Sequence, residues 1–199
     1  MTTLVLLDTN AYLRLAKRIK PLLGKKFGQK EYVLTILRDV EDEVHRNPRL
    51  RSRFPWFDAP DFSTERLAKT IRLDQDEKDA LAAATSVLRG FVLADPDRFL
   101  GKQRSPPSVT DCKLLAFAQL REVIVVTDDL PMHELAEIFE IEVWHGHELL
   151  KKMLSAKFIA NELVREIYDA LENNGDTPAT WRVARHTVFG RIFGPPADN

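Results

Sequence analysis

Short, unbroken runs of apolar residues alternate along this chain with stretches whose apolar positions recur at helical spacing. The runs, rich in Leu, Val and Ile, predict strands over residues 4–7, 31–36, 123–127 and 141–144. Strands that are apolar along their whole length are typical of parallel sheets, which helices cover on both faces. Because the strands alternate with helices, the pattern also predicts βαβ units. We therefore predict an α/β fold with three α/β/α layers around a central parallel sheet.

The stretches between the strands predict helices and three segments without regular structure. Apolar residues at helical spacing predict helices over residues 10–19, 39–46, 64–70, 76–89, 111–121 and 131–139. Residues 21–30 are rich in Gly and Lys and are predicted to form a turn. Residues 48–60 are predicted to be irregular, and residues 101–107, which end in two prolines, are predicted to form a loop.

The chain changes character near its last quarter, where strand patterns stop. A helical stripe follows, made of Leu150, Met153, Leu154, Phe158, Leu163, Ile167 and Leu171. It stops at Asn173-Asn174-Gly175, a sequence typical of a helix C-terminus. Thr177-Pro178 is typical of an N-cap followed by proline at the first helical position. A shorter helix through Trp181 and Phe189 is predicted to end at Gly194-Pro195-Pro196.

These patterns divide the chain into two parts. We predict a sheet domain over residues 1–148 and a helical C-terminal extension over residues 149–199. A helix with one apolar stripe must cover that stripe to be stable in water. The extension is therefore expected to pack on the sheet domain or on a second subunit.

Composition sets the broad class. The 199 residues have room for one α/β domain with an appendage, and 44% hydrophobic with 30% charged residues is ordinary for a soluble globule. The net charge of −1 does not indicate a polyanion partner, so nucleic-acid binding would depend on local patches. Cys112 is the single cysteine, which excludes an internal disulfide framework. Since no apolar stretch reaches membrane-spanning length and the first residues do not resemble a signal peptide, a cytoplasmic protein is expected.

Acidic residues follow two of the predicted strands. Asp8 ends the first apolar run, and Asp128 and Asp129 end the third. In open α/β sheets the ligand site lies outside the carboxyl ends of the strands, so these acids are expected at one rim. Crowded carboxylates raise each other's pKa unless a cation compensates them. For a cluster of oxygen ligands the simplest cation is Mg²⁺ or Mn²⁺.

Two further acids come from predicted helices, and helix capping is an alternative role for several of these five acids. Glu43 is the chosen acid of the run Glu41-Asp42-Glu43 because it lies directly before apolar Val44. Asp111 also fits a capping box with Ser108 as the cap. At the first strand, Asp8 is itself a good N-cap residue. We expect Thr9 or Asn10 to cap the helix instead, which leaves Asp8 for the metal. After the third strand, one of Asp128 and Asp129 could instead cap the helix that starts near Pro131.

The order of these acids, Asp, Glu, Asp, Asp, and their sequence context carry a family resemblance. The motifs are Leu6-Leu7-Asp8-Thr9-Asn10, Val40-x-x-Glu43-Val44, Ser108-Val109-Thr110-Asp111 and Val125-Val126-Thr127-Asp128-Asp129-Leu130. With them, residues 1–150 resemble the PIN-domain family of metal-dependent nucleases, which includes the VapC-type toxins of bacterial toxin–antitoxin pairs. The stretch from Arg46 to Pro107 is longer than in compact toxins, and the extension lies outside the family domain.

The resemblance implies a ribonuclease. Its acidic quartet would be Asp8, Glu43, Asp111 and Asp129, with Asp128 as a helper, and these acids would hold Mg²⁺ or Mn²⁺. Phosphodiester hydrolysis of RNA is the implied reaction, since a bound ion lowers the pKa of water and offsets charge in the transition state. An antitoxin is an expected partner if the protein is a toxin, and we also expect a homodimer.

Basic residues cluster near the predicted rim. No acid interrupts a run of seven bases, which are Arg14, Lys17, Arg18, Lys20, Lys25, Lys26 and Lys30. Four more arginines alternate with aromatic residues in the next segment, namely Arg46, Arg49, Arg51 and Arg53 with Phe54, Trp56 and Phe57. Such residues together can bind phosphates and stack on bases, although we expect the aromatics more often to cover the core. We predict that Asn10, Arg14, Lys17 and Thr127 contact the substrate.

Other functions stay open at this point. A silent PIN-like module that binds RNA or a protein partner would keep the fold and lose turnover. A phosphotransferase with an aspartyl nucleophile needs Asp-x-Asp after the first strand, where this chain has Asp8-Thr9-Asn10. His145 and His147 without nearby thiols are poor evidence for zinc. His133 follows the third strand and is predicted to be exposed.

Overall fold

A five-stranded sheet forms the centre of the computed structural model, which describes residues 2–100 and 104–195. The strand order is β2-β3-β1-β4-β5. The strands are β1 (Thr3–Leu7), β2 (Lys26–Phe27), β3 (Tyr32–Thr35), β4 (Ile124–Val126) and β5 (Val143–Trp144). β1 pairs in parallel with β3 and β4, and β4 pairs in parallel with β5. The predicted α/β class is confirmed.

The sequence predicted a wholly parallel sheet, and this prediction is wrong for one strand, because β2 runs antiparallel to β3. The sequence predicted only a turn here. Gly24 and Gly28, with φ of 76° and 68°, let the chain reverse on each side of this short strand. Phe27 then packs against Tyr32 and Phe158, with ring centroids 5.5 and 5.3 Å apart. Long-range packing, which no local pattern reveals, creates this strand.

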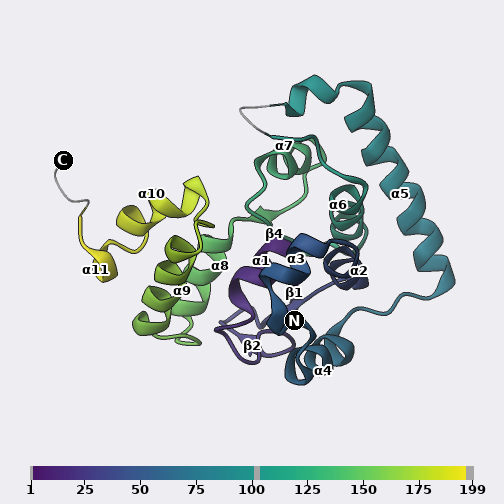
Figure 1. The fold of residues 1–199 in the computed structure, drawn as a ribbon. Coiled ribbons are helices and arrows are strands. Elements are labelled where there is room, and N and C mark those ends of the chain that lie inside the picture. The colour runs from purple at the N-terminus through teal and green to yellow at the C-terminus, as the bar shows by residue number, and fades with distance from the viewer. Residues whose placement is uncertain (1, 101–103, 196–199) are drawn as a thin grey trace.

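Helices cover both faces of the sheet, which gives three layers. Leu6 of β1 packs in one hydrophobic cluster and its neighbours Val5 and Leu7 pack in the other, because successive strand residues point to opposite faces. The first face is covered by α5 (Gln75–Ala94), the 3-10 helix η2 (Pro96–Phe99), α6 (Val109–Arg121) and α7 (Leu130–Ile138). The second is covered by α1 (Thr9–Leu15), α2 (Arg38–Arg46), α4 (Pro60–Lys69) and the helices of the extension. Figure 1 shows α5 and the extension on opposite sides of the molecule.

Residues 48–60, predicted to be irregular, are mostly helical. They form α3 (Pro48–Arg53) and the 3-10 helix η1 (Pro55–Asp58), and α4 begins at Pro60. Each proline occupies a first helical position, where its missing N–H has no helical partner to lose. The Asn47 side chain caps α3 by accepting bonds from the N–H groups of Arg49 and Leu50. The prolines therefore start helices here.

The extension contains more helices than predicted. They are α8 (Gly146–Ser155), α9 (Asn161–Asn173), α10 (Ala179–Thr187) and α11 (Gly190–Phe193). The predicted stripe is broken between α8 and α9, where Lys157 adopts a left-handed φ of 56°. Gly175, at φ 61°, follows the end of α9 as expected. The N-cap of α10 is Pro178, one residue later than predicted.

The apolar stripe of the extension is buried within the chain. Leu150, Met153, Ile167 and Leu171 belong to the same hydrophobic cluster as the apolar residues of α1 and β1. Leu154, Phe158 and Leu163 pack partly buried against that cluster. Among the described residues, no helix is both long and apolar enough to cross a membrane.

Candidate active site

Asp8 lies where β1 ends and α1 begins. Its backbone N–H donates to Val126 O of β4 at 3.0 Å, so it sits at the carboxyl ends of two adjacent parallel strands. Its side chain is the N-cap of α1 and accepts a bond from the Ala11 N–H. The prediction that Thr9 or Asn10 caps this helix is therefore wrong. Asn10 is exposed beside the cap.

Burial controls the ionisation of Asp8. Only 7% of the residue is exposed, and this burial raises its pKa from 3.8 to about 7. Hydrogen bonds from Thr127 and Ala11 act in the opposite direction, and the nearby Asp128 adds a further increase. A carboxyl with this pKa is only partly ionised at neutral pH, so a cation that bound it would displace a proton.

Glu43 is the acid of the α2 run that contacts the Asp8 region. Its Oε2 accepts a 2.6 Å hydrogen bond from the hydroxyl of Thr9, the residue after Asp8. The two preceding acids have other partners: Glu41 pairs with Arg66 at 2.8 Å, and Asp42 lies 3.7 Å from Arg46.

Asp111 and Asp129 lie on the other side of the rim. Asp111 forms the predicted capping box of α6, in which its carboxylate accepts from Ser108 N at 2.7 Å and Ser108 Oγ accepts from Asp111 N at 3.2 Å. Asp129 precedes α7, and its carboxylate makes no capping bond. Burial, followed by the charge of Asp111, raises the pKa of Asp129 to about 6, while Arg104 lowers it.

A cavity of about 360 Å³ lies between α2 and the start of α6. Glu43 lines it from α2, and Thr110, the neighbour of Asp111, lines it from the start of α6. The structure thus places Glu43 beside Thr9, next to Asp8, and brings the charge of Asp111 near Asp129.

These acids do not form a closed metal cage. Within residues 2–100 and 104–195, no three His, Cys, Asp or Glu side chains are arranged so that they could hold an ion. The donor chemistry nevertheless fits Mg²⁺ or Mn²⁺, because all four side chains offer carboxylate oxygens. Burial also leaves Asp8 and Asp129 with raised pKa values. Binding an ion would require the carboxylates to turn toward one another.

Asp128, predicted as a helper ligand, is used to attach the extension. Its carboxylate accepts bonds from Trp181 Nε1 at 2.9 Å, Gly146 N at 3.0 Å and Arg14 at 3.0 Å. Burial alone would raise its pKa, but the nearby His145, the Arg14 charge and the hydrogen bonds from Gly146 and Trp181 lower it below the ordinary value. These contacts make Asp128 a structural carboxylate.

Two of the predicted substrate contacts also have structural roles. Thr127 is fully buried, and its hydroxyl accepts a 3.1 Å bond from Asp129 N, so it positions Asp129 and does not reach the surface. Arg14 is 12% exposed and pairs with both Asp128 and Asp176. Lys17 is exposed. Sequence analysis missed the role of Arg14 because its partners lie 114 and 162 residues away.

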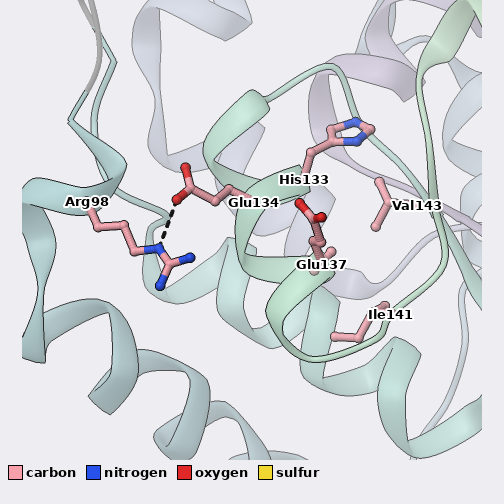
Figure 2. Close-up of a pocket in the computed structure, with 7 residues that line it drawn as sticks. Arg98, His133, Glu134, Glu137, Ile141 and Val143 are labelled. Atoms are coloured by element: carbon pink, nitrogen blue, oxygen red, sulfur yellow. Dashed lines mark hydrogen bonds and ion pairs between the residues drawn. The ribbon is translucent and has the colours of Figure 1, made fainter.

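The histidines form a separate group. The rings of His133 and His145 stack with centroids 3.9 Å apart, and His147 lies 5.3 Å from His145. His133 was predicted to be exposed but is half-buried, and its Nε2 lies 2.9 Å from Thr127 O. It lines an open pocket on α7 that also contains the 2.9 Å ion pair of Arg98 with Glu134 (Figure 2). None of the four acids lines this pocket.

The raised pKa of Asp8 predicts a stability that falls as pH rises. The folded protein holds this proton up to about pH 7 and the unfolded chain loses it near pH 3.8, so the contribution is complete below pH 3.8 and disappears through pH 7. This difference between the folded and unfolded pKa values of Asp8 corresponds to at most about 4 kcal/mol of folding free energy. In chelator, Asp8→Asn should therefore melt above the parent at pH 8, and the gap should shrink toward pH 4. A gap that is constant across this range in thermal melts would contradict the assignment.

Comparison with known proteins adds a weak structural likeness. No protein-family model matches the sequence, and no curated protein matches it. The chain is similar to a chain in the crystal structure of FitAcB from Neisseria gonorrhoeae, with 15% identity and a TM-score of 0.42. The similarity covers 71% of this chain and 97% of that one. A likeness this weak carries no conclusion about activity, and the family resemblance stays a prediction.

Proposed function

We propose that this protein is a metal-dependent ribonuclease. The observation that carries the proposal is the pair Asp8 and Asp129, two shielded carboxyls beside the carboxyl ends of adjacent parallel strands. Burial is the largest cause of the raised pKa of each, and within the described residues neither forms an ion pair with Lys, Arg or His. Partly buried acids that no ion pair neutralises, at this edge of an α/β sheet, suit a site that binds a cation.

In this proposal the chain's own residues prepare the site. Asp8, Glu43, Asp111 and Asp129 would hold Mg²⁺ or Mn²⁺, which when bound lowers the pKa of water and offsets charge on phosphate. The hydroxyl of Thr9 holds Glu43 beside Asp8. The hydroxyl of Thr127 holds the backbone of Asp129. RNA is the proposed substrate; a toxin role with an antitoxin partner, and a homodimer, stay predictions.

A second candidate is a silent module that binds RNA or protein without cleaving. The capping bonds favour it, since Asp8 caps α1 and Asp111 caps α6 as ordinary structural residues would. The open arrangement of the acids among the described residues also favours it. The two functions differ in a single measurable property, which is metal-dependent turnover.

The direct experiment incubates the purified protein with end-labelled single-stranded RNA and Mn²⁺, Mg²⁺ or chelator. Cleavage with either ion and none in chelator is expected. Asp61→Asn is a suitable control, because Asp61 is exposed on α4. RNA that binds and stays intact with both ions would favour the silent module and reject the ribonuclease.

Metal binding itself can be measured at Glu43. Glu43→Gln should weaken Mn²⁺ binding at least about tenfold, equivalent to about 1.4 kcal/mol, because it removes one negative ligand. Asp42→Asn is the matched control on the same helix, since Asp42 lies beside Arg46. Isothermal titration calorimetry or electron paramagnetic resonance of Mn²⁺ measures the Mn²⁺ affinity of both variants. Equal affinities for the two variants would exclude Glu43 as a ligand.

A further inference from the structure

A second cavity lies where α1, the junction of α3 with η1, and the end of α9 meet. Its volume is about 340 Å³. It is lined from α1 by Arg14, Lys17 and Arg18, and from the junction by Arg53 and Trp56. The extension closes it with residues such as Asp176, so the cavity depends on parts of the chain outside the family-like region.

The lining of this cavity is strongly basic. Four cations and one carboxylate, that of Asp176, line it, and Asp128 behind the wall also pairs with Arg14 at 3.0 Å, which leaves a formal charge of +2. Arg14 and Arg53 share that carboxylate at 3.3 and 3.7 Å. Lys17 and Arg18 form no ion pair within residues 2–100 and 104–195. In a chain with net charge −1, this concentration of cations favours an anionic ligand.

Aromatic rings share the cavity with these cations. Phe54 and Trp56 line it and are both half-buried. Trp56 is anchored by Phe62, with centroids 4.7 Å apart, and by Phe54 at 6.1 Å in an edge-to-face arrangement. Rings fixed beside cations are suited to stacking on unpaired bases whose phosphates the cations hold.

The cavity lies within reach of the acids. Arg14 and Lys17 follow Asp8 by six and nine residues on and just after α1. At about 1.5 Å per helical residue they lie roughly 9–14 Å from it along the helix. A nucleic-acid strand covers this distance in a few nucleotides at about 3.4 Å or more each. One strand can therefore contact both places.

We propose that this cavity is a nucleotide subsite for single-stranded RNA, in which Lys17 and Arg18 bind a phosphate and Trp56 stacks on a base. The proposal rests on the proposed function, because it names a second place where the same substrate is held. Asp176 keeps Arg14 and Arg53 in position at the wall of the cavity. The extension thereby contributes to substrate binding.

Binding is best tested apart from cleavage, with a labelled single-stranded oligoribonucleotide in chelator. Lys17→Gln combined with Arg18→Gln should weaken binding about tenfold or more. The slope of log affinity against log salt should fall by at most about 1.4, the value for two lost phosphate contacts. The matched control combines Lys25→Gln and Lys30→Gln, two exposed cations of the same basic run that do not line the cavity. It should change affinity less than about twofold.

Tryptophan fluorescence tests the stacking. Trp144 and Trp181 are 6% and 0% exposed, so acrylamide quenching reports mainly on Trp56. RNA should protect Trp56 from quenching in the parent protein. Protection should be lost in the Lys17→Gln, Arg18→Gln variant.

Each contrary outcome has a distinct meaning. Equal weakening by the cavity variant and the control would show diffuse charge attraction and overturn the subsite, as would unchanged quenching on RNA binding. An acidic peptide that displaced RNA from the cavity at similar concentration would assign it to a protein partner. Metal-dependent cleavage with an unchanged KM in the cavity variant would reject the subsite alone. Normal RNA binding without cleavage would reject the ribonuclease alone.

Discussion

Asp8→Asn is expected to lower the rate of RNA cleavage about a thousandfold while leaving the protein folded. The substitution keeps the shape of the side chain and removes the negative charge that would hold the ion. Metal ions supply several kcal/mol of transition-state stabilisation, and each 1.36 kcal/mol is tenfold in rate. The amide oxygen still accepts the capping bond from Ala11, so α1 keeps its N-cap. Cleavage of end-labelled RNA at saturating Mn²⁺ measures the effect.

Asp129→Asn should behave like Asp8→Asn, because both carboxyls are proposed ligands. Asp128→Asn is the contrasting variant, since Asp128 binds Arg14 and Trp181. It should lower the melting temperature and change the rate at low temperature far less. An Asp8→Asn protein that cleaved RNA as fast as the parent would end the ribonuclease proposal, whatever the family resemblance suggests.

The parts of the fold that follow from local pattern could be predicted from the sequence. β1, β3, β4 and β5 lie within or next to the predicted runs because strands of a covered sheet must be apolar along their length. β2 has two residues and depends on the packing of Phe27 against Phe158, which is distant in sequence. The break between α8 and α9 depends on a left-handed Lys157, although lysine is a good helix former and a positive φ is uncommon for any residue other than glycine.

In the candidate site, too, the positions of the acids could be predicted but their contacts could not. Strand ends place Asp8 and Asp129 at the rim, which the alternation of strands and helices predicts. The use of each carboxylate depends on contacts that no spacing reveals. Asp128 and Asp129 are adjacent and chemically identical, yet a tryptophan 53 residues away binds only the first. Similarly, Glu43 accepts a hydrogen bond from Thr9, whereas Glu41 forms an ion pair with Arg66.

The extension is attached to the candidate site through Trp181. This side chain is fully buried and donates to both carboxylate oxygens of Asp128 at 2.9 Å. It also packs on Tyr168, with ring centroids 5.3 Å apart. A Cβ at Gly146 would lie 2.7 Å from Trp181 Cζ2, so the start of α8 is fitted closely around the indole. Packing and a buried hydrogen bond therefore meet at one residue.

Trp181→Ala is accordingly expected to destabilise the protein by about 4 kcal/mol or more. Truncation of a buried Trp costs roughly 3–5 kcal/mol, and a buried acceptor that loses its donor costs about 1–3 kcal/mol. Trp181→Phe should cost less, because it keeps much of the ring volume and removes only the N–H. Val183→Ala, on the same helix with Val183 65% exposed, should change stability by no more than about 0.5 kcal/mol. Urea denaturation measures all three, and a Trp181→Ala protein as stable as Val183→Ala would show that the extension does not hold Asp128 in place.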